Sequence, residues 1–268
     1  MAPTVGWVST PPAVLHIVPG PLIARGREAS IHEVDGARVL RRYDDARDVT
    51  AEVAVMQHVA RHGFPVPRVH GVHLGAEGRP TGMVLERLRG PSLIEAALDG
   101  ALGPAGIGQT LARLHADLHR VPVEGLSPLA GGGQIQPGDV VVHLDLHPAN
   151  VMLADGAPVV IDWAIARTAP ATLDTAMTAL TLAAAAVAGI PRDAGDVARL
   201  PVPAPLIRAV LDAYLAALTT PPAASLERAA AVLDLIGAQP PEVVRAALGM
   251  VRSSLAKDDT GPGRSRES

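Results

Sequence analysis

The chain has no cysteine and only one lysine among its 268 residues. Without cysteine, neither disulfide bonds nor thiolate metal sites can form, and this composition fits a reducing cytoplasm. The one lysine, Lys257, belongs to a polar tail at residues 257–268 that we expect to be disordered. A cation that binds phosphate groups within the fold must therefore be an arginine.

A positive charge surplus and long apolar runs are also missing. The formal net charge is −4 and no basic patch dominates, which argues against a nucleic-acid partner. Residues 1–20 contain no lysine or arginine, unlike the start of a secretory signal. The run Ala176–Ala188 is shorter than the ~20 residues that a membrane span needs, so we predict a buried core helix there. We expect a cytoplasmic protein with no membrane partner.

One segment carries most of the chemical information. It reads HLDLHPANVMLADG at residues 143–156 and is followed by IDW at residues 161–163. The preceding run Val140–Val142 indicates a short strand, and Asp155-Gly156 is a two-residue turn signal between two apolar runs. We therefore predict a β-hairpin that begins after Asn150 and ends before Asp162.

This hairpin would bring two oxygen ligands together. Reflection about the turn pairs Asn150 with Ile161, so Asp162 would lie diagonally next to Asn150. A carboxamide oxygen and a carboxylate suit Mg²⁺, which completes its shell with water and substrate phosphates. Asp145, one loop upstream, is left to accept a proton. In the alternative, His143 and Asn150 only satisfy local backbone groups, but the spacing of the whole set favours a functional site.

The spacing His-x-Asp-x-x-x-x-Asn, followed by a strand-ending aspartate, resembles the catalytic and metal loops of the protein-kinase-like fold. The form HLDLHPANVM with IDW is similar to the aminoglycoside phosphotransferase and choline kinase family. Protein kinases carry arginine after the histidine and Asp-Phe-Gly at the metal loop, whereas this chain has Leu144 and the sequence Asp162-Trp163-Ala164. The resemblance covers about Gly26 to Asp174.

The resemblance implies an α+β, bilobal fold. A small lobe with an antiparallel sheet and one helix, residues 1–88, would bind the nucleotide, and a larger, mainly helical lobe, residues 89–256, would carry the catalytic loop and the acceptor site. It also implies that ATP and Mg²⁺ are cofactors, that Asp145 is the catalytic base, and that Asn150 and Asp162 are Mg²⁺ ligands. The implied reaction transfers the γ-phosphoryl group of ATP to a hydroxyl of a small molecule.

The amino-terminal part reads as three short strands, at Leu22–Arg25, Ala29–Val34 and Arg38–Tyr43. Reflection about the turn Asp35-Gly36 pairs Ser30 with Arg41, so we expect both to share one face. Gly26 opens the loop into this hairpin, where backbone amides could approach phosphates. A plain hairpin remains the alternative, because isolated glycines mark turns everywhere.

A helix is predicted from about Ala46 to His62, ending at Gly63. Glu52 lies on its apolar stripe, where an unpaired carboxylate would be costly. Arg41 is the expected partner, with Arg42 as the competing choice, and a solvated Glu52 is the alternative. By resemblance, the Arg41–Glu52 pair replaces the lysine–glutamate pair that positions ATP phosphates in kinases.

The strand Thr81–Leu85 leads into a segment that the resemblance identifies as the hinge. There the backbone of Glu86 and Leu88 would hold the adenine edge, whereas the alternative is an ordinary linker between lobes. Further along, Gly131–Gly133 indicates a flexible connection before the catalytic strand.

The carboxy-terminal part contains helical patterns separated by proline-rich breaks. A stripe of leucine and isoleucine at Ile107–Leu118 predicts a helix whose His115 and His119 are better explained as core-edge or solvated residues than as metal ligands. Asp174 either braces the catalytic loop, as in the family, or is a first-turn acid favoured by the helix dipole. Further helices are predicted at residues 173–189, 204–218, 222–236 and 241–255.

The acceptor is the least determined part of this interpretation. The loop after Asp162 is too short for the peptide-docking segment of protein kinases, which favours a small-molecule acceptor. Between Thr175 and Ala256, six acidic residues balance six arginines, without the acidic surplus that a polycationic aminoglycoside would want. We therefore expect a neutral or weakly charged hydroxylated acceptor. The rival hypothesis is a catalytically idle kinase-like nucleotide-binding protein.

Overall fold

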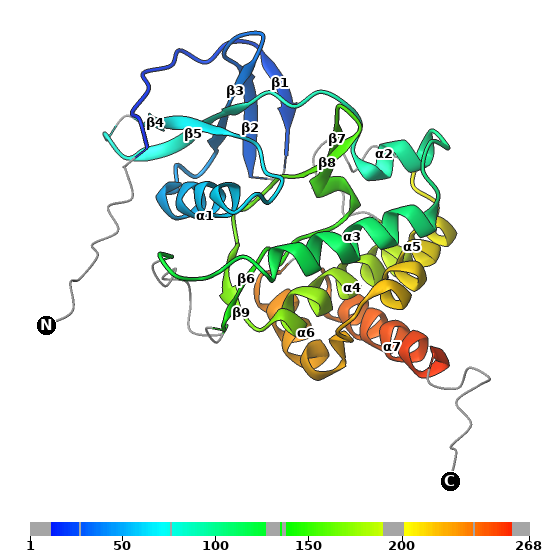
Figure 1. Cartoon of the computed structure of the whole chain (residues 1–268). Coiled ribbons are helices and arrows are strands. Elements are labelled where there is room, and N and C mark those ends of the chain that lie inside the picture. The colour runs from blue at the N-terminus through cyan, green and yellow to red at the C-terminus, as the bar shows by residue number, and fades with distance from the viewer. Residues whose placement is uncertain are drawn as a thin grey trace, which may run out of the picture.

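The computed structural model describes residues 12–26, 28–75, 77–126, 135, 138–189, 201–237 and 239–258. Over these residues the chain forms a sheet-based lobe followed by a helical lobe (Figure 1). The expected glycine-rich connection at Gly131–Gly133 and the tail beyond residue 258 lie outside this part of the chain.

The amino-terminal lobe is an antiparallel sheet of five strands in the order β1-β2-β3-β5-β4. Helix α1 lies beside it (Figure 1). Strand β4 was not predicted from the sequence. It is an edge strand whose Val72 also bonds the backbone of Ala13 and Leu15. The elements are β1 (Leu22–Arg25), β2 (Ala29–Glu33), β3 (Arg38–Tyr43), α1 (Thr50–Arg61), β4 (Val69–Leu74) and β5 (Pro80–Glu86).

The register of the β2–β3 hairpin differs by one residue from the expected register. Ser30 pairs with Arg42, and Arg41 pairs with Ile31. The loop has three residues rather than two, because the Asp35 carboxylate accepts a hydrogen bond from the Ala37 amide at 2.9 Å and closes a wider turn. A shift of one residue moves every side chain to the other face. The expectation that Ser30 and Arg41 share a face is therefore wrong.

Helix α1 begins at Thr50, four residues later than expected. Ala46 has a left-handed backbone with φ of +51°, and the Val49 amide donates to the Pro80 carbonyl of β5 at 2.9 Å. These two features hold residues 46–49 outside the helix. The predicted end is confirmed, because Gly63 has a φ of +81° and its amide donates to the carbonyl of Ala60.

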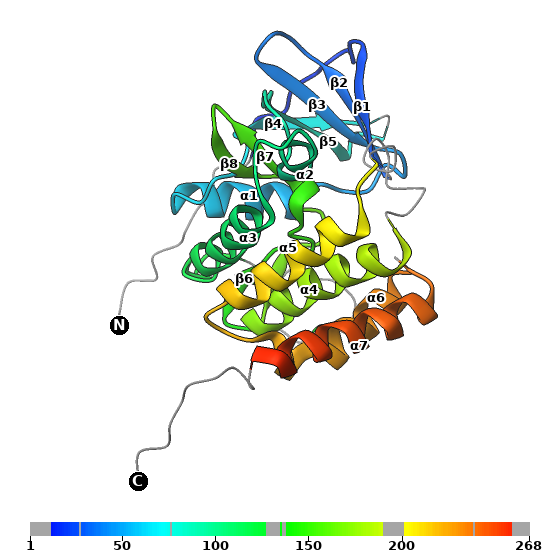
Figure 2. The same cartoon turned by 90° about the vertical axis from the view of Figure 1, so that its right-hand side faces the viewer.

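The carboxy-terminal lobe consists of helices and two small two-stranded sheets (Figures 1 and 2). Helix α2 was not predicted from the sequence, although its capping box of Ser92 and Glu95 is a readable signal. Strand β9, which pairs with β6, was not predicted either. The elements are α2 (Leu93–Leu98), α3 (Pro104–Leu118), β6 (Val140–Val142), a 3₁₀ turn (Pro148–Asn150), β7 (Val151–Ala154), β8 (Ala157–Val160), β9 (Arg167–Ala169), α4 (Ala171–Ala188), α5 (Ala204–Ala217), a second 3₁₀ turn (Pro222–Ser225), α6 (Leu226–Leu235) and α7 (Pro241–Asp258).

Helix α4 is the centre of this lobe and packs against α5, α6 and α7 (Figure 2). By length and composition alone it could cross a membrane, but most of it is buried among the other helices. Leu173, Met177 and Leu180 have almost no exposed surface. The prediction of a buried core helix is confirmed.

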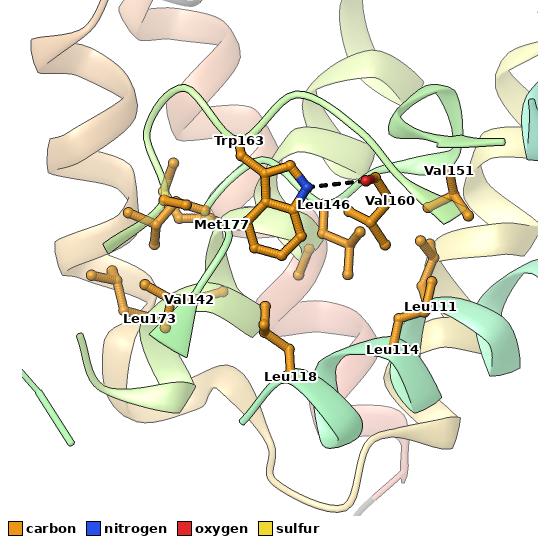
Figure 3. Close-up of a cluster of buried hydrophobic side chains, with 14 of the residues drawn as sticks. Leu111, Leu114, Leu118, Val142, Leu146, Val151, Val160, Trp163, Leu173 and Met177 are labelled. Atoms are coloured by element: carbon orange, nitrogen blue, oxygen red, sulfur yellow. Dashed lines mark hydrogen bonds between the residues drawn. The ribbon is translucent and has the colours of Figure 1, made fainter. Parts of the chain in front are cut away.

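Trp163 anchors the segment Ile161–Trp163 in this core. Its side chain is completely buried among apolar residues that include Leu118, Leu146 and Met177 (Figure 3). The indole Nε1 donates to the Val160 carbonyl at 3.0 Å, so its polar atom is satisfied. Burial of this large ring holds the preceding residue, Asp162, at the lobe surface that faces the sheet.

Candidate active site

The catalytic loop follows β6 and is held by buried hydrogen bonds. The His143 ring is fully buried, and its Nε2 donates to the Ile161 carbonyl at 3.1 Å while Nδ1 accepts from the Asp145 amide at 3.2 Å. Burial lowers the pKa of His143, so the ring is neutral in this arrangement. Thr178 of α4 donates to the Leu146 carbonyl at 2.7 Å. His143 therefore serves the loop as a structural residue.

Asp174, in the first turn of α4, braces the same loop. Its carboxylate accepts hydrogen bonds from the amides of His143, at 3.2 Å, and Leu144, at 2.6 Å. The other neighbours are His119, whose Nε2 lies 3.0 Å from Oδ2, and His115, at 3.6 Å. Burial by itself would raise the pKa of Asp174, but the two histidines and the hydrogen bonds outweigh it and lower the pKa well below the usual range.

These contacts decide two alternatives that the sequence left open. Asp174 is a loop brace rather than only a helix-dipole acid, because both of its oxygens are bonded to the catalytic loop. His115 is buried in the core, and His119 is mostly buried beside the same carboxylate. Both histidines thus belong to the core edge.

Asp145 is held in place by Asn150. The Asn150 amide nitrogen donates to the Asp145 carbonyl at 2.9 Å and to its carboxylate Oδ2 at 3.1 Å. The Asp145 side chain is 40% exposed through the cavity, with protein atoms on its other sides. Burial raises the pKa of Asp145, and the nearby Asp162 adds to this effect, while His147, 3.6 Å away, opposes it.

Asp162 lies directly after the hairpin and has a left-handed backbone, with φ of +64°. The predicted hairpin is confirmed: Leu153 pairs with Pro158, and the Ile161 amide donates to the Asn150 carbonyl at 3.0 Å. Burial acts to raise the pKa of Asp162, but the guanidinium of Arg41 outweighs it and the net pKa is lowered. Asp162 is therefore a carboxylate with a lowered pKa that directly follows Ile161, the residue bonded to Asn150 across the hairpin.

Arg41 connects the two lobes. Its Nη1 donates to Glu52 Oε1 of α1 at 2.8 Å, and its Nη2 donates to Asp162 Oδ1 at 2.5 Å. The second Glu52 oxygen accepts from the Tyr43 hydroxyl at 2.7 Å. Burial raises the pKa of Glu52 more than Arg41 and Tyr43 lower it. Burial also acts to lower the pKa of Arg41, but the carboxylates of Asp162 and Glu52 outweigh it and keep the guanidinium protonated. The predicted Arg41–Glu52 pair is confirmed, and Arg42 is exposed on the opposite face.

A cavity of about 760 Å³ lies between the lobes, and most of the predicted site residues line it. Ser30 is not among its lining residues. Its hydroxyl instead lies on the other face of the sheet, where it donates to the Arg42 carbonyl and contacts His32. Glu52 lies behind Arg41 and does not line the cavity. The predicted residues that do line it are Gly26, Arg41, Glu86, Leu88, Asp145, Asn150 and Asp162.

Two features of the cavity escaped the sequence analysis. His147 lines it next to Asp145, and the spacing of two residues from Asp145 is the only signal that could have pointed to it. Apolar side chains from both lobes enclose the region near the hinge, and they include Ile31, Val39, Leu85, Met152 and Ile161. Such walls suit a flat apolar ring.

The donor set at one end of the cavity fits a hard divalent cation. Asp162 offers an ionised carboxylate. The side-chain nitrogen of Asn150 bonds to Asp145, so the carboxamide oxygen of Asn150 points away from Asp145. Within the described ranges, no three His, Cys, Asp or Glu side chains gather closely enough to hold a metal by themselves. A cation here would need phosphate and water oxygens in addition.

Two lobes around one cavity that holds the oriented carboxylate of Asp145, the oxygens of Asn150 and Asp162, and the guanidinium of Arg41 define the class of protein-kinase-like phosphotransferases. The model of the phosphotransferase enzyme family matches residues 22–137 and 134–217, so the chain belongs to this family. It is a small-molecule phosphotransferase by this membership. No curated protein sequence matches the chain.

Two solved structures with TM-scores of 0.53 and 0.50 share the fold of the chain. A Ralstonia eutropha JMP134 protein, provisionally named an aminoglycoside phosphotransferase, has 14% identity and a TM-score of 0.53, covering 88% of this chain and 94% of that chain. An amicoumacin kinase in complex with AMP-PNP and Ca²⁺ has 16% identity and a TM-score of 0.50, covering 94% and 85%. A choline/ethanolamine kinase family protein from Mesorhizobium loti has 14% identity and a TM-score of 0.47, covering 90% and 89%. At these identities the likeness is one of fold.

Proposed function

We propose that the protein transfers the γ-phosphoryl group of ATP to a hydroxyl group of a small molecule. One observation carries the proposal: Arg41 of β3, Asp145 and Asn150 of the loop after β6, and Asp162 after β8 line the same cavity. A base, two cation ligands and a phosphate-binding cation are the parts that phosphoryl transfer needs, because the reaction depends on positioning and charge stabilisation.

Asp145 is the base in this mechanism. It accepts the proton of the acceptor hydroxyl while the hydroxyl oxygen forms a bond to the γ-phosphorus. The bond between this phosphorus and the β,γ-bridging oxygen breaks, and ADP leaves with that electron pair. The pKa of Asp145, raised by burial, makes the carboxylate a stronger base than an exposed aspartate. Asn150 keeps it oriented through the two hydrogen bonds from its amide nitrogen.

The nucleotide occupies the side of the cavity that faces the sheet. Its base would lie between the apolar walls near Glu86 and Leu88, and its phosphates would lie near Arg41, which lines the same cavity. Glu52 holds the guanidinium in position from behind. Asn150 and Asp162 would hold Mg²⁺, which would supply neutralisation of the charge on the phosphate oxygens.

The rival proposal, an idle nucleotide-binding protein, draws on the Arg41–Asp162 ion pair. In that pair, Arg41 occupies Oδ1 of Asp162, one of the two proposed metal ligands. In addition, Arg41 stands where protein kinases have a lysine. Against it, a protein that only binds nucleotide has no need for an oriented base such as Asp145. The two proposals differ in whether bound ATP is consumed.

The test combines binding with turnover. We expect ATP with Mg²⁺ to raise the melting temperature of the protein and slow ATP hydrolysis to follow in the absence of an acceptor. Asp145→Asn should keep the nucleotide-induced shift and lower ATP consumption by ~10²-fold or more, the scale of a lost general base. Asp155→Asn, at the exposed turn of the hairpin, is the control and should match the wild type. A wild type that binds ATP and never consumes it would establish the idle protein.

A further inference from the structure

The cavity continues past Asp145 into a compartment between three helices, which we name the acceptor arm. It is the part of the cavity lined by α4, α5 and the end of α6. The three helices contribute side chains at helical spacing, so each presents one face to the arm. These side chains include Met177, Thr181 and Ala185 of α4, Ile207 and Val210 of α5, and Ile236.

The arm begins beside the catalytic base. Thr178 of α4 donates its hydroxyl to the Leu146 carbonyl, one residue after Asp145, at 2.7 Å. Thr181 lies one helical turn further along α4 and lines the cavity. A molecule whose hydroxyl reaches Asp145 therefore extends its remaining part along this face of α4.

Over the described residues, the helical wall of the arm contains no charged side chain. The charged residues of the cavity lie in the amino-terminal lobe, the hinge and the catalytic segments. The acids of α5 and α6 are exposed: Asp212 pairs with Arg208, Glu227 pairs with Arg252, and Asp234 does not line the cavity. An ammonium group in the arm would thus lose water without gaining a partner from this wall.

No phenylalanine, tyrosine or tryptophan ring lines the described part of the cavity either. Phe64, Trp163 and Tyr214 are buried in the core, and Tyr43 faces Arg41 and Arg47 from the sheet. A quaternary ammonium group is recognised by aromatic faces, so this wall offers it no site. The polar side chains of the helical wall are Thr181 and the nearby Gln239.

We propose that the acceptor is an uncharged alcohol with a large apolar body. Its hydroxyl lies at Asp145, its body packs against α4, α5 and α6, and Thr181 provides a polar contact. Ile236, 49% exposed, forms the apolar rim of the arm. This inference rests on the proposed phosphoryl transfer for the meaning of Asp145, but the arm itself can be tested by binding alone.

The probes are n-alkyl β-D-glucosides with tails of one to eight carbons, used below their micelle concentrations, together with kanamycin and choline. Calorimetric titration of the full chain should show tighter binding as the tail grows, by roughly threefold to fourfold for each buried methylene. Kanamycin and choline should bind more weakly than octyl glucoside.

Two neighbouring residues provide matched variants. Ile236→Asp places a carboxylate at the rim of the arm and should abolish the dependence on tail length. Leu235→Asp makes the same change at the adjacent, 60% exposed residue that does not line the cavity, and it should leave the dependence intact. Thr181→Asp is a second arm variant, on a different helix, and should act like Ile236→Asp. Melting curves check that each variant is folded.

Equal effects of Ile236→Asp and Leu235→Asp, binding that ignores tail length, or tighter binding of kanamycin or choline would overturn the proposal. The expected binding pattern together with ATP-dependent phosphorylation of the long-tailed glucosides supports both the arm and the transfer. The expected binding pattern without any consumption of ATP would uphold the apolar arm and overturn the phosphoryl transfer instead.

Discussion

At the scale of single residues, the adjacent arginines Arg41 and Arg42 lie in different surroundings. Arg41 points to the cavity and contacts Glu52 and Asp162, whereas Arg42 is exposed on the other face of β3. Arginine replaces the compact ammonium of a lysine with a planar fork, which can hold two carboxylates at once. The chain thus uses one guanidinium where the related kinases use a lysine.

Arg41→Ala should weaken ATP binding by roughly 10-fold to 100-fold, because a hydrogen bond to a charged group is worth about 1.5–3 kcal/mol. Arg42→Ala is the matched control and should have little effect. Arg41→Lys should retain part of the affinity, since the charge remains. Titration of ATP in the presence of Mg²⁺ measures all three, and a larger loss in Arg42→Ala would assign the phosphate contact to Arg42.

At the scale of elements, the catalytic loop depends on the helix that follows it in the chain. Asp174 anchors the loop through two backbone amides, and Thr178 adds a third bond one turn later. Both residues lie on α4, whose apolar residues are buried in the core of the lobe. The rigidity of α4 is therefore transmitted directly to the position of Asp145.

Asp174→Asn should lower the free energy of unfolding at pH 7 by about 2 kcal/mol or more, since a buried charged acceptor is lost. The folded-state pKa of Asp174 lies below its unfolded value of about 3.9. Its stabilising effect is thus present above that value and is lost as the pH falls towards the folded pKa. Urea unfolding should show the difference between wild type and variant shrinking below about pH 4.

The control for this measurement is Asp117→Asn on α3, whose side chain is 48% exposed and pairs with Arg120 at the surface. Such a pair contributes only about 0–1 kcal/mol. A stability difference for Asp174→Asn that stays constant down to pH 2, or one no larger than that of Asp117→Asn, would contradict the brace.

At the scale of the whole molecule, the cavity depends on both lobes. Arg41 of the sheet contacts Asp162 of the helical lobe, although 121 positions separate them in the chain. The proposed metal site lies on the helical side of this contact and the proposed phosphate site on the sheet side. The proposed nucleotide site therefore requires both lobes.

Asp162→Ala should abolish the increase in ATP affinity that Mg²⁺ produces, and Asn150→Ala should reduce it, because both supply oxygen ligands. Asp155→Asn, at the far end of the same hairpin, should leave this increase unchanged. ATP titrations with and without Mg²⁺ measure the effect as a ratio of affinities. If the ratio is the same in Asp162→Ala and Asn150→Ala as in the wild type, the ligands are elsewhere.

The sequence by itself determined the elements whose hydrogen bonds are local. The hairpin around Asp155-Gly156 follows from a two-residue turn signal between apolar runs, and its register was predictable for that reason. The carboxy-terminal helices follow from periodic apolar residues between proline-rich breaks. The Arg41–Glu52 pair was also predictable, because a carboxylate on an apolar helix face requires a partner.

Only the tertiary structure decided the remaining features. One of them is local: the side chain of Asp35 widened the turn of the β2–β3 hairpin, and that single residue removed Ser30 from the cavity. The others depend on distant contacts. The brace formed by Asp174 and the apolar arm between α4, α5 and α6 join segments far apart in the chain. Periodicity predicts which face of a helix is buried but not what that face meets, because the partner is selected by packing of the whole core.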